Sequence, residues 1–148
     1  TKEDFAQVLA QRAADILNPD ICAVGGLQQM LDIAAMAQPH AVAISPHNYN
    51  STIVGLAATV HFSALIPNFL IAECFINLQS ACERIARPGI AMQAGWADIP
   101  QAPGLGVDID VDELRKHPYQ DFPHKDMRQY WEEFPRKNYV WGVANVTR

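Results

Sequence analysis

Three ionisable side chains stand directly behind three apolar runs, and together their types suit the transfer of a proton at a carbon atom. Asp20 follows Ala-Asp-Ile-Leu-Asn-Pro, His47 follows Ala-Val-Ala-Ile-Ser-Pro, and Glu73 follows Phe-Leu-Ile-Ala. Histidine ordinarily titrates near neutrality, which suits a general acid or base. A carboxylate on its far ring nitrogen would fix the tautomer, and a second acid could assist where negative charge develops.

The spacing of these residues indicates the architecture that carries them. Asp20 and His47 are 27 residues apart, and His47 and Glu73 are 26 apart, which is about one strand–helix–strand unit each. Successive parallel strands end at the same edge of a sheet. We therefore expect the three side chains at the C-terminal ends of three parallel strands, where β/α barrels carry their chemistry.

The elements that must position them are three strands and three helices. The expected strands cover residues 15–20, 41–45 and 69–72, and the expected helices cover residues 4–14, 27–37 and 52–66. The second strand consists of small and β-branched residues, as is typical of strands buried on both faces. Gly25-Gly26 separates the first strand from its helix, and Pro67-Asn68 ends the last helix.

The alternation of strands and helices does not continue after Glu73. Residues 84–107 are rich in Pro and Gly, which predicts a meandering loop with short edge strands. A short helix is expected from Asp110 to His117, with Asp110 as its N-cap. The segment from Pro118 to the end is aromatic and charged and should pack on a surface. We therefore divide the chain into barrel elements at 1–83 and a post-barrel segment at 84–148.

Composition excludes several classes of protein. The chain has 148 residues, 49% hydrophobic content and a net charge of −5, which is typical of a globular domain and argues against a nucleic-acid surface. No apolar run approaches the roughly 20 residues of a membrane helix. The opening residues do not resemble a secretory signal, so we expect a cytoplasmic location. Cys22, Cys74 and Cys82 lack metal-type spacing, and we expect them to be reduced and buried.

Three strands do not close a barrel, which needs about eight strands and about 250 residues. An open sheet this apolar would leave its edges and faces uncovered. We therefore expect either the C-terminal part of a larger protein or a chain that another chain completes. The alternative is a small doubly wound domain, for which Val24-Gly25-Gly26-Leu27 is a weak phosphate-loop signal.

Four segments carry a resemblance to a known family. They are Asn-Pro-Asp-Ile-Cys-Ala-Val-Gly-Gly (18–26), Ser-Pro-His-Asn (45–48), Ile-Pro-Asn-Phe-Leu-Ile-Ala-Glu (66–73) and Pro-Gly-Leu-Gly-Val-Asp-Ile-Asp (103–110). Over roughly residues 4–118, the chain resembles the C-terminal part of the enolase superfamily. It is most similar to the mandelate racemase-like branch, particularly sugar-acid dehydratases of the D-galactonate type.

The resemblance implies a modified TIM barrel, (β/α)7β, of which this chain would supply strands six to eight, together with a separate capping domain. It implies that Asp20 and His47 form a catalytic dyad and that Glu73 hydrogen-bonds the substrate or its enediolate. The family uses Mg²⁺, held by acids on strands three to five, which would lie upstream of Thr1. No residue of this chain is therefore assigned as a metal ligand.

We predict that the chain belongs to an enzyme that removes the proton next to a carboxylate, most simply a sugar-acid dehydratase forming a 2-keto-3-deoxy acid. A racemase or cycloisomerase is the enzymatic alternative, because all of these share the first proton abstraction. A non-catalytic fragment or structural subunit is the other alternative. The expected partners are a sugar-acid substrate, the rest of the barrel with its capping domain, and further copies in a homo-oligomer.

Each candidate residue also has a structural interpretation. Asp20 follows Asn-Pro and suits a turn or helix cap, His47 could be structural, and Glu73 could be a surface charge. Asn48 and Asn50 are candidates for binding substrate hydroxyls, but loop capping is equally compatible with their positions. The remaining histidines have no partner pattern and are assigned structural roles: His40, His61, His117 and His124.

Overall fold

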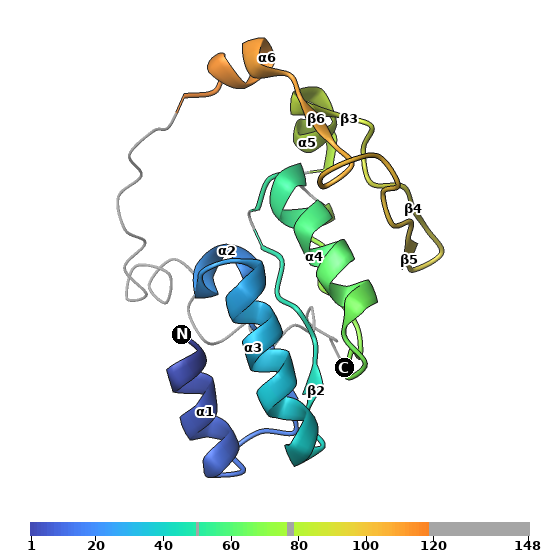
Figure 1. Ribbon diagram of the computed structural model, residues 1–148. Coiled ribbons are helices and arrows are strands. Elements are labelled where there is room, and N and C mark those ends of the chain that lie inside the picture. The colour runs from blue at the N-terminus through green and yellow to red at the C-terminus, as the bar shows by residue number, and fades with distance from the viewer. Residues whose placement is uncertain (50, 77–78, 119–148) are drawn as a thin grey trace, which may run out of the picture. The chain divides into compact units, whose positions relative to one another are not determined.

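The computed structural model describes residues 1–49, 51–76 and 79–118 (Figure 1). The elements run in the order α1 (Lys2–Ala10), β1 (Ile16–Leu17), α2 (Ile21–Val24), α3 (Leu27–Ala37), a 3-10 helix (Gln38–His40), β2 (Ala43–Ile44), α4 (Ile53–Leu65), α5 (Gln79–Ile85), β3 (Ala86–Arg87), β4 (Met92–Gln93), β5 (Trp96–Ala97), β6 (Asp108–Ile109) and α6 (Val111–Arg115). Residues 1–117 form one unit of α/β architecture. The aromatic tail predicted to pack from Tyr119 onward lies outside the described residues.

The first two strands pair in parallel with an unbroken register. Backbone N–H groups of Ala43, Ser45 and His47 donate to the carbonyl oxygens of Asp15, Leu17 and Pro19 at 3.1, 2.9 and 3.0 Å. The pairing of Ile16 with Ala43 continues to a bridge between Asp20 and His47. The spacing of 27 residues seen in the sequence is therefore the register of the sheet itself.

The third expected strand, residues 69–72, forms only one bridge, between Phe69 and Ile44. Leu70 N–H donates to Ile44 at 2.9 Å, and Glu73 N–H donates to Pro46 at 3.0 Å. The step from Ile44 to Pro46 is two residues, whereas the step from Leu70 to Glu73 is three. One extra residue is therefore inserted between Leu70 and Glu73. Such an insertion disrupts the ladder locally, which is why the predicted strand is not regular.

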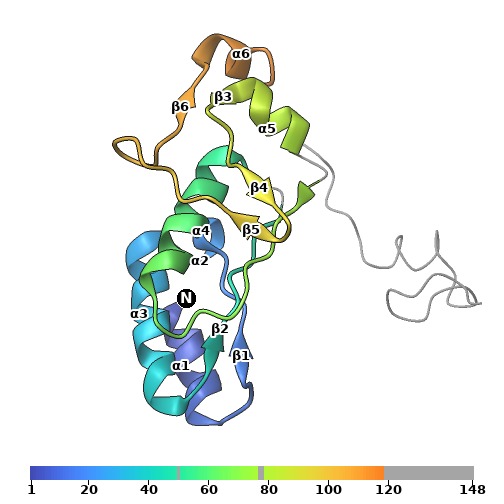
Figure 2. The ribbon, with the colours of Figure 1, turned by 90° about the vertical axis from the view of Figure 1, so that its right-hand side faces the viewer.

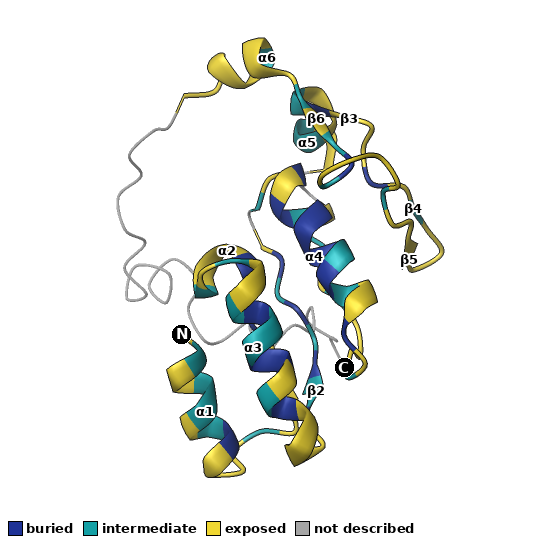
Figure 3. Cartoon of the chain, in the orientation of Figure 1, coloured by how far each residue is buried: buried dark blue, intermediate teal, exposed yellow. Residues whose placement is uncertain are grey.

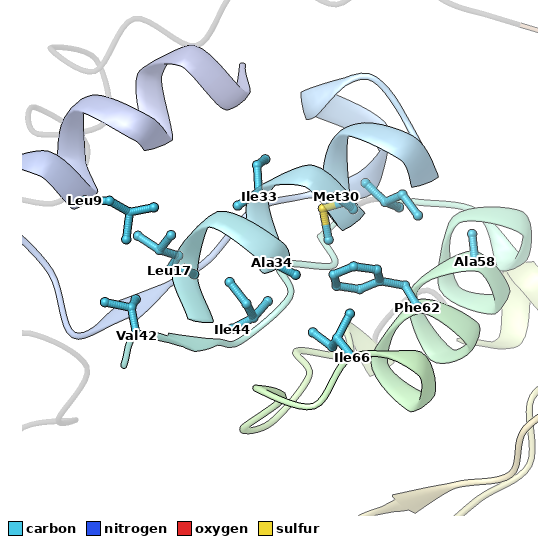
Figure 4. Packing of buried hydrophobic residues seen from close by; sticks show 12 residues of the cluster. Leu9, Leu17, Met30, Ile33, Ala34, Val42, Ile44, Ala58, Phe62 and Ile66 are labelled. Atoms are coloured by element: carbon cyan, nitrogen blue, oxygen red, sulfur yellow. The ribbon is translucent and has the colours of Figure 1, made fainter. Parts of the chain in front are cut away.

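Helices α1, α3 and α4 lie on one side of β1 and β2 (Figure 2), and the main core fills the space between. From Val42 to Tyr49, every even-numbered residue is buried and every odd-numbered residue is more exposed. Figure 4 shows Ile44 packed with Met30, Ala34 and Phe62 from α3 and α4. The second strand is therefore buried on one face only among the described residues, rather than on both as its composition suggested.

The outer face of these strands keeps apolar side chains in solvent. Ile16, Phe69 and Ile71 are exposed, and Figure 3 shows how exposed and buried residues divide between faces of the helices and strands. Parallel strands ordinarily have both faces covered. The described part of the chain supplies a cover for one face alone.

The helices differ from their expected limits at the ends. The helix predicted at 4–14 runs from Lys2 to Ala10, because Thr1 and Asp4 form a capping box at its start. It ends early because Arg12 has a positive φ of 50°, which no helix tolerates. Arg12 therefore lies outside the helix, although it falls within the predicted range. The predictions of residues 27–37 and of Thr52 as the start of α4 are confirmed.

Residues 79–118 form short elements around a second core cluster. Ile53, Ala57 and Val60 of α4 pack there against Ala86 and Ile90. The expected short edge strands are present, but the prediction of a loop missed α5. The boundary expected between residues 83 and 84 falls inside α5, and the division into barrel elements and a post-barrel segment stays a prediction. The predicted cap of α6 is confirmed, because the Asp110 carboxylate accepts from Glu113 N–H at 2.8 Å.

The cysteines depart from the prediction. Cys22 is exposed, and Cys74 and Cys82 are partly exposed, whereas all three were expected in the core. Of the three, Cys82 packs against the second core cluster. In the part of the chain that the structure describes, no helix combines the length and the hydropathy that crossing a membrane requires.

Candidate active site

Asp20 performs two structural tasks at the end of the first strand. It is the N-cap of α2, with Oδ1 accepting from the backbone N–H of Cys22 at 2.8 Å. Its Oδ2 lies 2.7 Å from Nδ1 of His47. The cap and the dyad, alternatives in the sequence, are therefore both present on one carboxylate. Because each carboxylate oxygen has its own partner, two hydrogen bonds orient the Asp20 side chain.

His47 lies between two acids. A carboxylate oxygen can only accept, so Nδ1 of His47 carries the hydrogen that is donated to Asp20. This leaves Nε2 as the ring nitrogen without a hydrogen, and it lies 3.5 Å from Oε2 of Glu73. Exposure rises along the series, from 15% for Asp20 to 36% for His47 and 45% for Glu73. The Nε2 end of the imidazole therefore faces the more exposed side of the site.

The extra residue before Glu73 decides which side its carboxylate occupies. In the register set by Phe69 and Ile44, Ala72 would lie beside His47. The shift of one residue brings Glu73 there instead, because a one-residue slip exchanges the two faces of a strand. A separation of 3.5 Å is long for a direct hydrogen bond, so Nε2 keeps room for a substrate proton.

Close packing between α2 and α4 supports the Asp20 end of the site. A Cβ added at Gly55 would lie 2.8 Å from Sγ of Cys22 and 2.7 Å from Cβ of Ser51. Only glycine allows this approach. Burial of that sulfur raises the pKa of the Cys22 thiol although the residue as a whole is exposed, and the nearby charge of Asp20 adds to the effect.

The two asparagines proposed as substrate ligands have different outcomes. Asn48 is only 5% exposed and faces away from His47, since its Nδ2 donates to Oγ1 of Thr59 on α4 at 3.3 Å. That geometry favours the loop-anchoring interpretation, and a contact with substrate stays a prediction. Asn50 lies outside the described residues.

Sequence reasoning missed three residues next to the site. The Asn18 amide donates to the carbonyl oxygen of Ser45. This bond links the two strands two residues before the dyad. Tyr49 lies beside His47, and Phe75 lies beside Tyr49. The signal for both rings was in the sequence, because each stands two residues after an acid–base residue and a strand repeats its faces with that period.

The residues do not fit a magnesium site by themselves. Within residues 1–49, 51–76 and 79–118, no group of three or more His, Cys, Asp or Glu side chains could hold a metal ion. Magnesium requires a near-octahedral set of oxygen ligands. Asp20 is already committed to the Cys22 amide and to His47. A magnesium ion next to this dyad would therefore need oxygen ligands from other residues.

The matching family settles the lineage of the chain. The family model described as Enolase C-terminal domain-like matches residues 1–114. The chain belongs to this family. The α/β fold agrees with the C-terminal barrel part of the enolase superfamily, which confirms the expected resemblance.

Curated relatives in this superfamily catalyse more than one reaction. The chain is 33% identical to a D-xylonate dehydratase of Haloferax volcanii, over 74% of the chain and 26% of that protein. It is 34% identical to a D-galactonate dehydratase of Ralstonia pickettii, over 72% and 29%. A D-galactarolactone cycloisomerase of Agrobacterium fabrum is 31% identical, over 73% and 30%. The chain thus spans less than a third of the length of these relatives.

A solved structure in the same superfamily has a similar backbone. It is an enolase from Agrobacterium radiobacter with bound Na and L-malate, which matches at a TM-score of 0.74 and 25% identity. The match covers 84% of this chain and 35% of that protein.

Proposed function

We propose that this chain supplies the acid–base half of an active site that removes the proton next to a carboxylate, in an enzyme that dehydrates sugar acids. The observation that carries the proposal is the line of Asp20, His47 and Glu73, with contacts of 2.7 and 3.5 Å. A bidirectional proton carrier needs a fixed tautomer on one nitrogen and an open second nitrogen, and His47 has both.

His47 Nε2 is the atom that would exchange a proton with the substrate. Asp20 holds the ring through Nδ1 and stabilises the charge that the imidazole gains when it takes a proton. In dehydration, the same nitrogen can deliver a proton to the departing β-hydroxyl, so that water leaves rather than hydroxide. Asp20 itself neither gains nor loses a proton in this scheme.

Glu73 would act on the substrate rather than on the histidine. Its carboxyl group is the most exposed of the three and borders the open nitrogen of His47. There it can hydrogen-bond a carboxylate or enediolate oxygen of the substrate when it carries a proton. This contact would strengthen as charge moves onto those oxygens in the transition state.

Further protein would complete the site, either more of the same chain or another chain. Two observations support this part of the proposal: the exposed apolar face of β1 and residues 69–71, and the small share of each relative that the chain covers. Mg²⁺ would be held by acids in that further protein. When bound, it would stabilise negative charge on the substrate carboxylate.

Cycloisomerisation or racemisation is the second candidate. It is favoured by the relative named as a D-galactarolactone cycloisomerase, whose identity of 31% is close to that of the dehydratases. All of these reactions begin with removal of the same kind of proton. The difference lies in where the electrons go next, which the acid–base pair alone does not decide.

The test uses the complete enzyme and a library of sugar acids with Mg²⁺. Dehydration predicts formation of a 2-keto-3-deoxy acid, abolished in His47→Asn and reduced on the order of 10²-fold in kcat by Glu73→Gln. Products of unchanged composition would favour isomerisation. Full turnover in His47→Asn would refute the acid–base assignment, and absence of any solvent exchange at the α-carbon would favour a non-catalytic subunit.

A further inference from the structure

Two aromatic side chains continue the face of the site on which His47 and Glu73 lie. Tyr49 stands two residues beyond His47, and Phe75 stands two residues beyond Glu73. Residues two apart on an extended segment point to the same side. The intervening Asn48 is buried against α4, as this alternation requires.

The ring geometry bears out the alternation. The centroids of Tyr49 and Phe75 are 4.6 Å apart, with their planes tilted by 55°. The Tyr49 ring lies 6.2 Å from the His47 ring. Two cross-strand pairs therefore follow one another: first the imidazole with the carboxyl group, then the two rings. We call Tyr49 and Phe75 the aromatic pair.

The aromatic pair is only partly covered within the described residues. Tyr49 is 49% exposed, and Phe75 is half-buried. A tilted pair at this distance is favourable beyond simple burial, so each ring holds the other in place. The pair thus presents an apolar surface next to His47.

We propose that the aromatic pair binds the carbon chain of a polyhydroxy carboxylate, beyond the end that reacts at His47. This inference rests on the proposed function and adds to it the part of the substrate that these residues recognise. A sugar acid carries its charge at one end and alternating C–H and O–H groups along the rest. Its C–H groups can pack on a ring face, while its hydroxyls remain free for polar partners.

The alternative is that Tyr49 merely shields the dyad from water. A shield would act on every substrate alike, because it would change His47 rather than a contact with the ligand. A binding surface acts only on ligands long enough to reach it. Chain length of the ligand therefore separates the two roles.

The experiment is calorimetric titration of the complete protein in a His47→Asn background, which prevents turnover. The ligands are the six-carbon acids D-gluconate and D-galactonate, together with glycolate, which has a carboxylate and one hydroxyl but no further chain. Tyr49→Leu removes the aromatic face, Tyr49→Phe keeps it, and Trp96→Leu removes an exposed ring on β5 as a matched control.

We expect Tyr49→Leu to weaken binding of a six-carbon acid about tenfold, the size of one lost aromatic contact, and to change glycolate binding less than about twofold. Tyr49→Phe and Trp96→Leu should both stay within about twofold of the parent. Equal effects on long and short ligands, no effect on either, or no binding of either six-carbon acid to the parent would overturn the inference.

The outcome can be separated from that of the proposed function. Loss of six-carbon binding in Tyr49→Leu, in a protein that converts no sugar acid when His47 is present, would keep the aromatic pair and reject the dehydratase. Conversion of sugar acids by the protein with His47, combined with unchanged binding in Tyr49→Leu, would keep the dehydratase and reject the aromatic pair.

Discussion

The two strand pairings that build the site differ in regularity. Between β1 and β2, three successive hydrogen bonds keep one register up to His47 and Pro19. Between β2 and residues 69–73, the register shifts by one residue before Glu73. The regular pairing produces the 2.7 Å contact of the dyad, and the irregular one produces the 3.5 Å contact with Glu73. In the proposed mechanism, the residues of proton transfer therefore lie on the regular pairing, and the proposed substrate contact of Glu73 lies on the irregular one.

The same contrast holds for the side chains themselves. Asp20 has a partner on each oxygen and is mostly covered, whereas the carboxylate of Glu73 has a polar partner only in His47 among the described residues. A general base must be oriented before the substrate arrives. An acid that follows charge onto the substrate gains from some freedom, because its best position depends on the ligand.

The largest effect is expected from separating the two tasks of Asp20. Asp20→Asn keeps an oxygen for the cap but loses the charged partner of Nδ1, so kcat should fall on the order of 10³–10⁴-fold while α2 stays formed. Asp20→Ala should lose the same activity and also about 1 kcal/mol of local helix stability. Turnover and hydrogen exchange at the Cys22 amide measure the two effects.

Two results would contradict this separation. Near-normal turnover in Asp20→Asn would mean that the regular pairing serves α2 alone and not the imidazole. Equal exchange rates at the Cys22 amide in Asp20→Asn and Asp20→Ala would mean that the side-chain cap contributes nothing to α2.

The irregular pairing can be tested by changing the length of the segment. One alanine inserted between Ala72 and Glu73 should turn the carboxyl group to the opposite face and lower kcat on the order of 10²-fold, as complete removal of its side chain would. Deletion of Ala72 should cost less, because the regular register then places the same carboxyl group beside His47. A deletion more harmful than the insertion would show that the inserted residue does not set the side.

The sequence predicted the regular half of the site better than the irregular half, for a physical reason. The dyad could be foreseen because the spacing of Asp20 and His47 equals the register of two ordinary parallel strands. The extra residue before Glu73 leaves the apolar run Phe-Leu-Ile-Ala unchanged, so no periodic pattern reveals it. The positive φ of Arg12 was hidden in a similar way. It belongs to a helix C-cap in which the N–H groups of Arg12 and Ala13 donate to the carbonyl oxygens of Leu9 and Val8, and no glycine marks the position in the sequence.

The family resemblance covered what periodicity could not. It supplied the expected roles of the three site residues, and the match over residues 1–114 confirms the family. The numbering of the strands as six to eight, and the roles of the site residues, stay predictions. The range of α3 was predicted, and its buried face is formed by Met30, Ile33, Ala34 and Ala37, whereas Leu27 at its start is exposed.

A smaller effect is expected where α4 supports the regular pairing. Gly55→Ala would bring a methyl group within 2.8 Å of Sγ of Cys22, so α2 must move or the packing must strain. We expect about 1–3 kcal/mol of destabilisation and about a tenfold fall in kcat, as Asp20 shifts with α2. Gly89→Ala is the control, because its nearest neighbour would be an ordinary 3.5 Å away.

The double variant Gly55→Ala, Cys22→Ala sharpens this test. Removing the sulfur should restore part of both losses, because it removes the Cys22 contact and leaves only the contacts of the new methyl group with Ser51. If activity and stability do not recover at all, the strain lies on the Ser51 side of Gly55, and α2 is not the element that moves.

The smallest expected effect concerns the thiol beside the dyad. Burial raises the pKa of Cys22, and the charge of Asp20 raises it further. Only the thiolate is alkylated, so the pH midpoint of the reaction with iodoacetamide should lie above that of an ordinary cysteine. Asp20→Asn should lower that midpoint and speed alkylation at pH 8 by about twofold, because burial, the larger cause, is unchanged.

Mass spectrometry of the Cys22 peptide across a pH series measures this midpoint, with Cys82 as the internal comparison. Burial also raises the pKa of Cys82, but its other influences are Glu83 and the backbone of Ile53 rather than Asp20. Asp20→Asn should therefore leave the Cys82 midpoint where it is. A shift of both thiols together would reveal a general loosening around α4, and the regular pairing would then be less rigid than its hydrogen bonds imply.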